Sequence, residues 1–242
     1  MLFLRSLMFN ILFFVWAMFS AVLFAPLFLF SSRTSLHAGK PWAKGALLLA
    51  RIACGITYEV RGSEYLSAAP LIYASKHQSA WDTLIFLTLL RHPAYVLKRE
   101  LLRIPLWGWY LWRMRMIAID RSAQASAMKQ MIKQAKAALE NGRPIVIYPE
   151  GTRTTPGAAP QYHPGTVALY SFLKQPVVPV ALNSGWYWGK DAFLKRPGKI
   201  IIEFLPPISP GLSKEEFSAR LEQSIETASQ KLLEEAKLPT QP

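Results

Sequence analysis

The first thirty residues constrain the fold and surroundings of this chain more than any other segment. No residue between Ser6 and Ser32 carries a charge, and residues 7–30 form an apolar run of 24 residues, LMFNILFFVWAMFSAVLFAPLFLF. About 20 residues of helix are enough to cross the hydrocarbon core of a bilayer. The apolar region of a signal peptide is usually only about 7–15 residues long. The run therefore predicts an uncleaved membrane anchor over residues 6–32, in which Pro26 kinks or ends the helix.

A second apolar stretch, residues 45–57, is too short to span a bilayer and is interrupted by Arg51. It is expected either to lie in the interface as a hairpin with the first run or to pack on the soluble part of the protein. Basic residues follow the anchor closely, at Arg33, Lys40, Lys44 and Arg51. By the positive-inside rule, the bulk of the chain is expected on the cytoplasmic side.

The composition limits which binding partners, disulfide bonds and metal sites can be expected. The formal net charge is +13, which predicts an anionic partner such as nucleic acid, anionic lipid or a phosphorylated substrate. A nucleic-acid-binding protein has no evident use for the uncharged N-terminal run, so no nucleic acid is expected. A single cysteine excludes a disulfide framework. The four histidines show no close-spaced ligand pair, so no metal site is predicted.

After residue 57 the pattern is that of an α/β protein. Short β-rich runs are expected as strands at residues 57–62, 70–75, 94–98, 116–120, 144–148, 176–182 and 199–205. Amphipathic helices are expected at 123–140 and at 214–236, the second opened by a capping box from Ser213 to Glu216. The predicted organisation is a membrane anchor, residues 1–56, and one α/β domain, residues 57–242, with a mixed central sheet flanked by helices.

The string SKHQSAWDT, residues 75–83, is the first candidate site for chemistry. A strand ends before His77, and Ser79 is suited to cap a helix that begins near Ala80. With His77 in the turn and Asp82 in the first helical turn, the two side chains can meet. A carboxylate on one ring nitrogen fixes the imidazole tautomer and leaves the other nitrogen as a base. The alternative is a surface histidine beside an aspartate that compensates the helix dipole.

Two further strings suggest anion binding. YPEGTRTTPG, residues 148–157, follows a strand, and its Gly151 and Arg153 suit a turn that binds phosphate. The alternative there is an ion pair between Glu150 and Arg153. Residues 97–121 interleave basic residues with Trp107, Trp109 and Trp112, a pattern typical of nucleic-acid stacking or of the membrane interface, and the adjacent anchor favours the membrane interface. Only Lys98, and less strongly Arg99, is expected to contact phosphate.

Taken together, four blocks in this order resemble the glycerolipid acyltransferases, and most of all the bacterial lysophosphatidic acid acyltransferases. The blocks are HQSAWD, KRELLRIPLWGW…IAIDR, YPEGTR and PVVPVALNSG, and the resemblance covers roughly residues 60–205. It implies that His77 is the general base and Asp82 its orienting partner. It also implies an acceptor-phosphate site at Lys98, Glu150, Gly151, Thr152 and Arg153. Val178, Pro179 and Val180 would belong to an acyl-donor channel or to its structural support.

The resemblance further implies transfer of a fatty acyl group from acyl-CoA or acyl-carrier protein to the sn-2 hydroxyl of 1-acyl-glycerol-3-phosphate (lysophosphatidic acid). The product would be phosphatidic acid for phospholipid synthesis, made at the inner membrane without a metal or organic cofactor. Where the family commonly has Lys-Gly, this chain has Tyr162-His163-Pro164-Gly165, which bears on the acceptor headgroup. The alternatives are an acyltransferase for another lysolipid and an inert membrane-bound lipid-binding protein.

Overall fold

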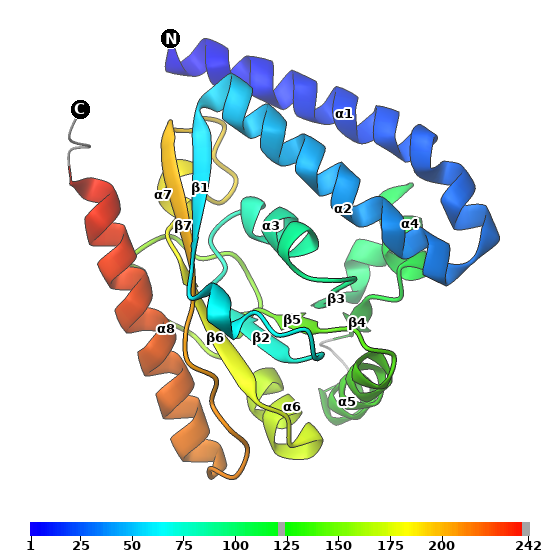
Figure 1. Cartoon of the computed structure of the whole chain (residues 1–242), viewed down its shortest axis with the longest axis vertical. Helices are drawn as coiled ribbons and strands as arrows, with labels where there is room; N and C mark the ends of the chain where they lie inside the picture. The colour runs from blue at the N-terminus through cyan, green and yellow to red at the C-terminus, as the bar shows by residue number, and fades with distance from the viewer. Residues whose placement is uncertain (121–123, 239–242) are drawn as a thin grey trace.

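A computed structural model describes residues 1–120 and 124–238 of the chain (Figure 1). Its strands are β1 (Ile56–Arg61), β2 (Ile72–Ser75), β3 (Ala94–Lys98), β4 (Ile117–Ile119), β5 (Ile145–Ile147), β6 (Val177–Leu182) and β7 (Gly198–Phe204). Its α-helices are α1 (Leu2–Phe30), α2 (Ser32–Leu49), α3 (Trp81–Leu89), α4 (Trp107–Arg113), α5 (Gln124–Glu140), α6 (Gly165–Leu173), α7 (Ser184–Tyr187) and α8 (Lys214–Lys237). A π-helical turn η1 (Ala50–Cys54) and the 3₁₀ segments η2 (Ser63–Tyr65) and η3 (Arg99–Arg103) complete the described elements.

The strands form one mixed sheet in the order β1-β7-β6-β2-β5-β3-β4. All the neighbouring pairs are parallel except β6 and β7, which are antiparallel. The central strands β2, β5 and β6 are buried at every residue, as expected for parallel strands that are covered on both faces. The predicted α/β class with a mixed sheet is therefore confirmed.

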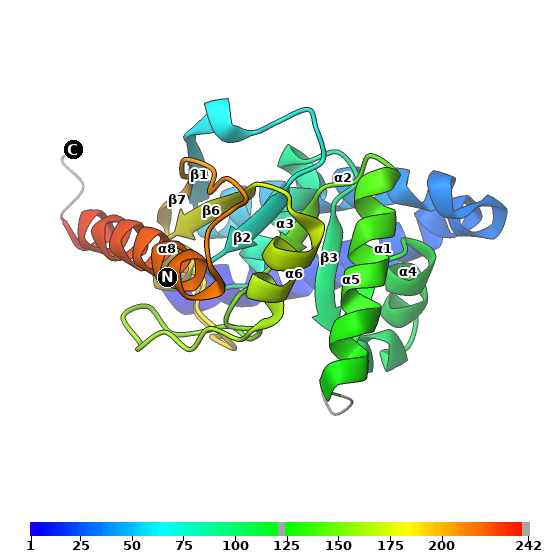
Figure 2. The same cartoon turned by 90° about the horizontal axis from the view of Figure 1, so that it is seen from below.

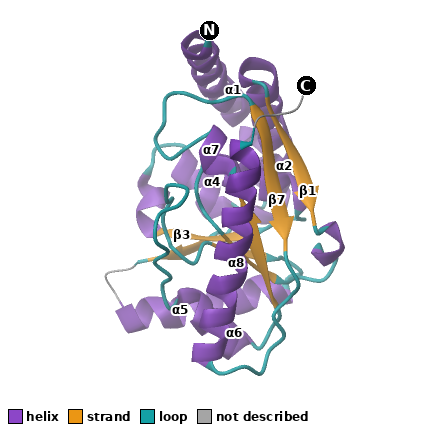
Figure 3. Ribbon diagram, turned by 90° about the vertical axis from the view of Figure 1, so that its left-hand side faces the viewer, coloured by secondary structure: helices purple, strands orange, loops and turns teal. Residues whose placement is uncertain are grey.

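Side chains alternate between two cores because successive strand residues point to opposite faces. On β2, Tyr73 packs in the core that faces α1, α2 and α3, whereas Ile72 and Ala74 pack in the core beneath α5, α6 and α8. Figure 2, seen from below, shows α5, α6 and α8 on the face away from α1. Figure 3 shows α8 alongside the long strands β1 and β7. The sheet is therefore the middle layer of the molecule.

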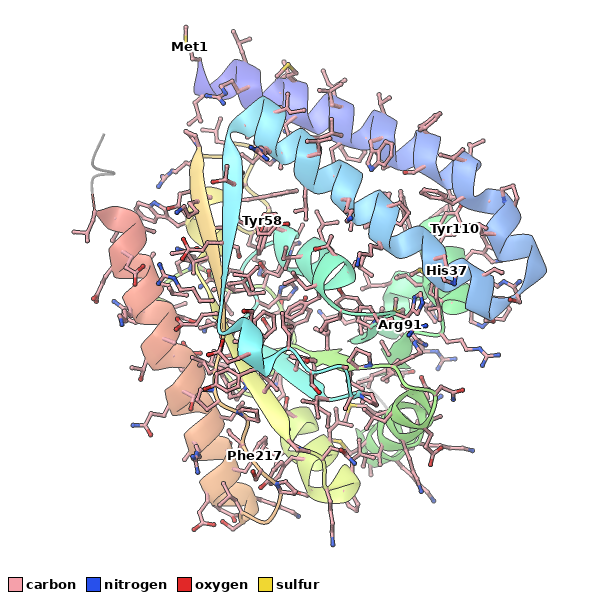
Figure 4. The ribbon with its side chains drawn as sticks, viewed as in Figure 1. Met1, His37, Tyr58, Arg91, Tyr110 and Phe217 are labelled. Atoms are coloured by element: carbon pink, nitrogen blue, oxygen red, sulfur yellow. The ribbon has the colours of Figure 1, made fainter. Side chains whose placement is uncertain are left out.

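The N-terminal run forms α1, which passes through Pro26 and ends at Phe30, so the proline does not end the helix. Helix α2 runs back along α1, and the expected interfacial stretch 45–57 is the last part of α2, η1 and the start of β1. Both ends of α1 contact the rest of the chain. Arg5 Nε donates to the carbonyl of Ala53 at 3.0 Å, and the Tyr110 hydroxyl, beneath α1 in Figure 4, donates to the carbonyl of Ala21.

Each of the seven predicted strands is present within two residues of its predicted ends. The predicted helix at 214–236 is α8, and its capping box between Ser213 and Glu216 is formed in both directions. The helix predicted at 123–140 is α5 from residue 124 onward. Residues 121–123 and the C-terminal residues 239–242 lie outside the described residues, so Arg121 of the second block is not placed. The prediction missed α4, α6, the short α7 and most of α2.

Candidate active site

The sheet topology brings the sequence blocks together at one edge. Strands β2, β3, β5 and β6 run parallel, so their carboxyl ends meet at that edge, where open α/β sheets usually bind ligands. His77 follows β2, Lys98 ends β3, and the YPEGTR turn follows β5. The turn from Asn183 to Gly185 follows β6. Residues far apart in the sequence are neighbours here for this reason.

His77 and Asp82 form the predicted pair. His77 Nδ1 lies 2.9 Å from Asp82 Oδ2, and the same oxygen accepts the backbone N–H groups of Gln78 and Ser79 at 2.7 and 2.8 Å. Asp82 is fully buried, while the His77 side chain retains 14% exposure. The contact at Nδ1 leaves Nε2 as the ring nitrogen available to a substrate. The predicted cap at Ser79 is wrong, because the N-cap of α3 is Ala80 and no side chain caps the helix; the Ser79 hydroxyl instead accepts the N–H of Trp81.

Tyr148, the residue before the PEGTR turn, holds the imidazole from one face. Its ring stacks on His77 with centroids 3.9 Å apart and an interplanar angle of 16°. Burial raises the pKa of Tyr148 well above its usual value, and the charges of Tyr95 and Asp82 raise it further. Its buried hydroxyl has no hydrogen-bond partner among the described residues. The ring stacking is therefore the main interaction that Tyr148 offers to the site.

A buried ion pair lies beneath the turn. Lys76 Nζ is 2.9 Å from Glu150 Oε1 and 2.8 Å from Glu226 Oε1, and the Lys76 and Glu150 side chains are almost fully buried. Glu150 Oε2 also accepts the hydroxyl of Thr154, and the hydroxyl of Tyr162 donates to Glu226. Glu150 thus fixes the turn from below. Its direct contact with a substrate phosphate stays a prediction, and this geometry favours a supporting role instead.

The cationic side of the site is more open. Arg153 is one-third exposed, and its guanidinium lies 2.9 Å from Asp191 Oδ1, an exposed carboxylate on the loop before β7. The anticipated alternative, an ion pair between Glu150 and Arg153, is not the pairing observed. Gly151 adopts a left-handed backbone with φ of 63°, which glycine tolerates without strain. Lys98 is exposed at the end of β3.

One cavity of about 1070 Å³ connects these groups with the N-terminal hairpin. At its polar part lie His77, Lys98, Gly151, Thr152, Arg153 and His163. One apolar wall comes from α1, α2 and α4, and another from α5 and the start of α6. Val178, Pro179 and Val180 lie in the buried centre of the sheet and not in the described lining of the cavity, so of their two expected roles the structure favours structural support.

Comparison with known proteins supports a shared ancestry for this arrangement. The family model described as "Acyltransferase" matches residues 57–183, which include the His77–Asp82 turn and the YPEGTR turn. The chain belongs to the acyltransferase family. The family that the four sequence blocks predicted is therefore confirmed.

Among the curated relatives of this acyltransferase is a 1-acyl-sn-glycerol-3-phosphate acyltransferase of Pseudomonas aeruginosa. It is 39% identical over 193 residues, which cover 80% of this chain and 74% of the relative. A protein of the same name from Limnanthes alba is 32% identical, over 64% of this chain and 56% of its own length. The crystal structure of a 1-acyl-sn-glycerophosphate acyltransferase from Thermotoga maritima superposes with a TM-score of 0.79, at 23% identity and over the whole of both chains. That structural similarity shows that the two chains share a fold.

Sequence reasoning assigned no role to Tyr148, Lys76 or Glu226, which help to hold the predicted side chains in place. Lys76 directly precedes His77 and Tyr148 is the first residue of the YPEGTR block, so their places in these motifs were an available signal. Glu226 is 150 residues from Lys76 in the sequence and sits on a helix that reads as ordinary amphipathic packing. Without the fold, no local signal connects it with the site.

Proposed function

We propose that this acyltransferase transfers a fatty acyl group from an acyl thioester to the 2-hydroxyl of 1-acyl-sn-glycerol-3-phosphate and so makes phosphatidic acid. The observation that carries the proposal is the His77–Asp82 contact in the wall of a largely apolar cavity that also holds Lys98 and Arg153. A base, a cationic site and room for acyl chains are the three parts that this reaction needs. The relatives named above carry the same activity in their names.

The dyad supplies the proton transfers. Nε2 of His77 takes the proton of the 2-hydroxyl as that oxygen attacks the thioester carbonyl. Asp82 stabilises the resulting imidazolium through Nδ1. When the tetrahedral intermediate collapses, the carbon–sulfur bond breaks and His77 returns the proton to the departing thiolate. The products are the ester and the free thiol, so no protein atom is acylated and no metal or organic cofactor is required.

Lys98 and Arg153 are proposed to bind the phosphate of the acceptor and thereby to orient its 2-hydroxyl toward His77. The guanidinium suits this role because it offers a forked set of donors to phosphate oxygens. Its partner Asp191 is 70% exposed, so an incoming phosphate can displace it at little cost. His163 also lines the cavity, at the position where the resemblance places a lysine of the family, and either it replaces that lysine or the position does not matter to the site.

Membrane association fits both substrates, which are lipids or carry acyl chains. Residues Leu2–Leu27 of α1 are long and apolar enough to cross a membrane by length and composition. The outward side of α1 exposes a row of large apolar side chains, among them Leu4, Ile11, Phe14, Val15 and Val22. We propose that the protein acts at the cytoplasmic face of the inner membrane, with acyl-CoA or acyl-carrier protein arriving from the aqueous side.

The experiment measures acyl transfer by the purified protein in vesicles. Each of three acceptors is tested with each of the two acyl donors. The acceptors are lysophosphatidic acid, lysophosphatidylcholine, whose phosphate is a diester, and monoacylglycerol, which has no phosphate. Conversion of lysophosphatidic acid well above the other two is expected. Conversion of lysophosphatidylcholine alone would point to another lysolipid as the acceptor. Failure with every acceptor and donor would favour an inert lipid-binding protein.

A further inference from the structure

The carboxylate of Asp82 has two oxygens, and the dyad uses only one of them. Oδ2 accepts His77 and the two backbone N–H groups of Gln78 and Ser79. Oδ1 accepts the hydroxyl of Ser184 at 2.5 Å, and both side chains are fully buried. A buried carboxylate oxygen is costly to leave without a donor. Ser184 therefore satisfies the second half of this group.

Ser184 reaches Asp82 because hydrogen bonds join the turn that carries it to β7, to α8 and to Gln78. Asn183 accepts the N–H of Ile201 and donates to the carbonyl of Leu232, which ties the turn to β7 and α8. The N–H of Gly185 donates to the side-chain oxygen of Gln78, next to His77. A Cβ atom at Gly185 would lie 2.8 Å from both Gln78 Cβ and Pro156 Cγ, so the turn fits closely against the dyad and the loop after YPEGTR.

We propose that Ser184 is a positioning residue of the acyltransferase reaction, which fixes the rotation of the Asp82 carboxylate so that Oδ2 points at His77 Nδ1. A carboxylate that accepts hydrogen bonds at both oxygens resists rotation about its Cβ–Cγ bond, which helps the imidazole to keep one orientation. The Ser184 hydroxyl is directed at Asp82 and is buried, so it acts through Asp82 and not on the substrate. The proposal rests on the proposed function for its kinetic readout.

The test compares Ser184→Ala with Ser229→Ala in the full-length protein. Ser229 is also a buried serine, on α8, and its hydroxyl has no partner among the described residues, so it controls for the loss of a buried hydroxyl. Ser184→Ala is expected to lower kcat by about 10–100-fold and to change the KM for lysophosphatidic acid by less than about twofold. Ser229→Ala is expected to keep the wild-type kcat. Wild-type kcat in Ser184→Ala would overturn the proposal.

A spectroscopic signature separates positioning from general support. In protein labelled with ¹⁵N-histidine, the Nδ1–H proton of His77 bound to a carboxylate is expected as a downfield resonance that His77→Ala removes. Ser184→Ala should shift or broaden this resonance, and Ser229→Ala should leave it in place. If the wild type makes no phosphatidic acid, the proposed function fails, whereas the resonance still tests the positioning role.

Ser184→Cys tests the proposal if the Ser184→Ala variant does not fold. It nearly preserves the volume, but the thiol is a weaker donor with a longer contact. A folded cysteine variant is expected to lose kcat about fivefold or more with little change in KM. Full kcat in that variant would overturn the proposal. So would unfolding of both variants, because a positioning role requires that the fold tolerate the loss of this donor.

Discussion

At the scale of single residues, Tyr148 is a neighbour of His77 whose contribution to kcat can be measured separately by a single substitution. Its ring provides a flat surface on one face of the imidazole, and an aromatic face would also favour the imidazolium of the proposed mechanism. Tyr148→Leu is expected to lower kcat by about tenfold because the imidazole gains freedom to rotate. Steady-state kinetics measure this, and a wild-type kcat in the leucine variant would contradict the role given to the ring.

The hydroxyl of Tyr148 makes a separate prediction about stability. It is buried without a partner among the described residues, and such a group costs about 1–3 kcal/mol of desolvation. Tyr148→Phe retains the ring and removes that group. Its free energy of unfolding is therefore expected to equal or exceed that of the wild type in denaturant titrations. A loss of more than about 1 kcal/mol would show that the hydroxyl has a partner after all.

Arg153 governs acceptor binding in this account. Arg153→Ala is expected to raise the KM for lysophosphatidic acid by about 10–100-fold, since hydrogen bonds to charged groups contribute about 1.5–3 kcal/mol. Asp191→Asn is the matched control, because it removes the carboxylate seen on Arg153 and keeps the cation. It should leave KM unchanged or lower it. An unchanged KM in Arg153→Ala would place the phosphate elsewhere.

At the scale of secondary-structure elements, Lys76 joins the end of β2 to α8 and to the turn after β5. Lys76→Met leaves the buried carboxylate of Glu150 without its cation, and Glu226 loses the same partner. We expect a loss of about 3 kcal/mol in the free energy of unfolding, measured by denaturation in detergent. Lys136→Met, which breaks an exposed pair with Glu140, should cost less than about 0.5 kcal/mol. Equal losses in the two variants would contradict this.

The elements also show where prediction from sequence succeeded and where it could not. Short β-rich runs bounded by turns predicted every strand, because that pattern is local. Most of the segment that forms α2 was not assigned, and it contains Gly39, Pro41 and Gly45, which are unfavourable inside a helix. Its glycines make sense only beside other parts of the chain, since a Cβ at Gly45 would lie 2.2 Å from the ring of Trp16 on α1.

The same distinction applies to the site. His77 and Asp82 belong to one turn, so the sequence allowed the contact that the structure shows, and the resemblance to the acyltransferase blocks favoured it. Ser184 lies 102 residues from Asp82, and only the parallel pairing of β2 with β6 brings the two together. The catalytic and binding roles of the site residues, and the division of the chain at residue 56, stay predictions.

At the scale of the whole molecule, α1 is held along its length and not only at one end. Arg5 and Ser6 contact Ala53 and Lys195 near its start, and Tyr110 binds the carbonyl of Ala21 near its other end. The 29 residues of α1 measure about 43 Å in length. If α1 spanned the bilayer, some of these polar contacts would therefore lie inside the hydrocarbon core. An orientation in the plane of one leaflet keeps all of them and still buries the exposed apolar row.

Spin labels on that row measure the orientation. Leu4, Phe14 and Val22 are 67%, 67% and 74% exposed, and the native Cys54 is buried, so single cysteines at these positions are labelled cleanly. An in-plane helix predicts similar depths for all three labels, within about 5–10 Å of the headgroup boundary. A label at Phe14 about 12–15 Å deeper than the other two would show instead that α1 spans the membrane.

The central claim is that His77 acts as the base, and one comparison tests it most directly. Wild type, His77→Ala and His37→Ala are assayed in vesicles with lysophosphatidic acid and a labelled acyl donor. His37 is an exposed histidine on α2, so its variant controls for the loss of an imidazole. We expect kcat to fall at least about 100-fold in His77→Ala alone, with the unfolding transition of that variant retained. A folded His77→Ala variant that makes phosphatidic acid at a near-normal rate would contradict it.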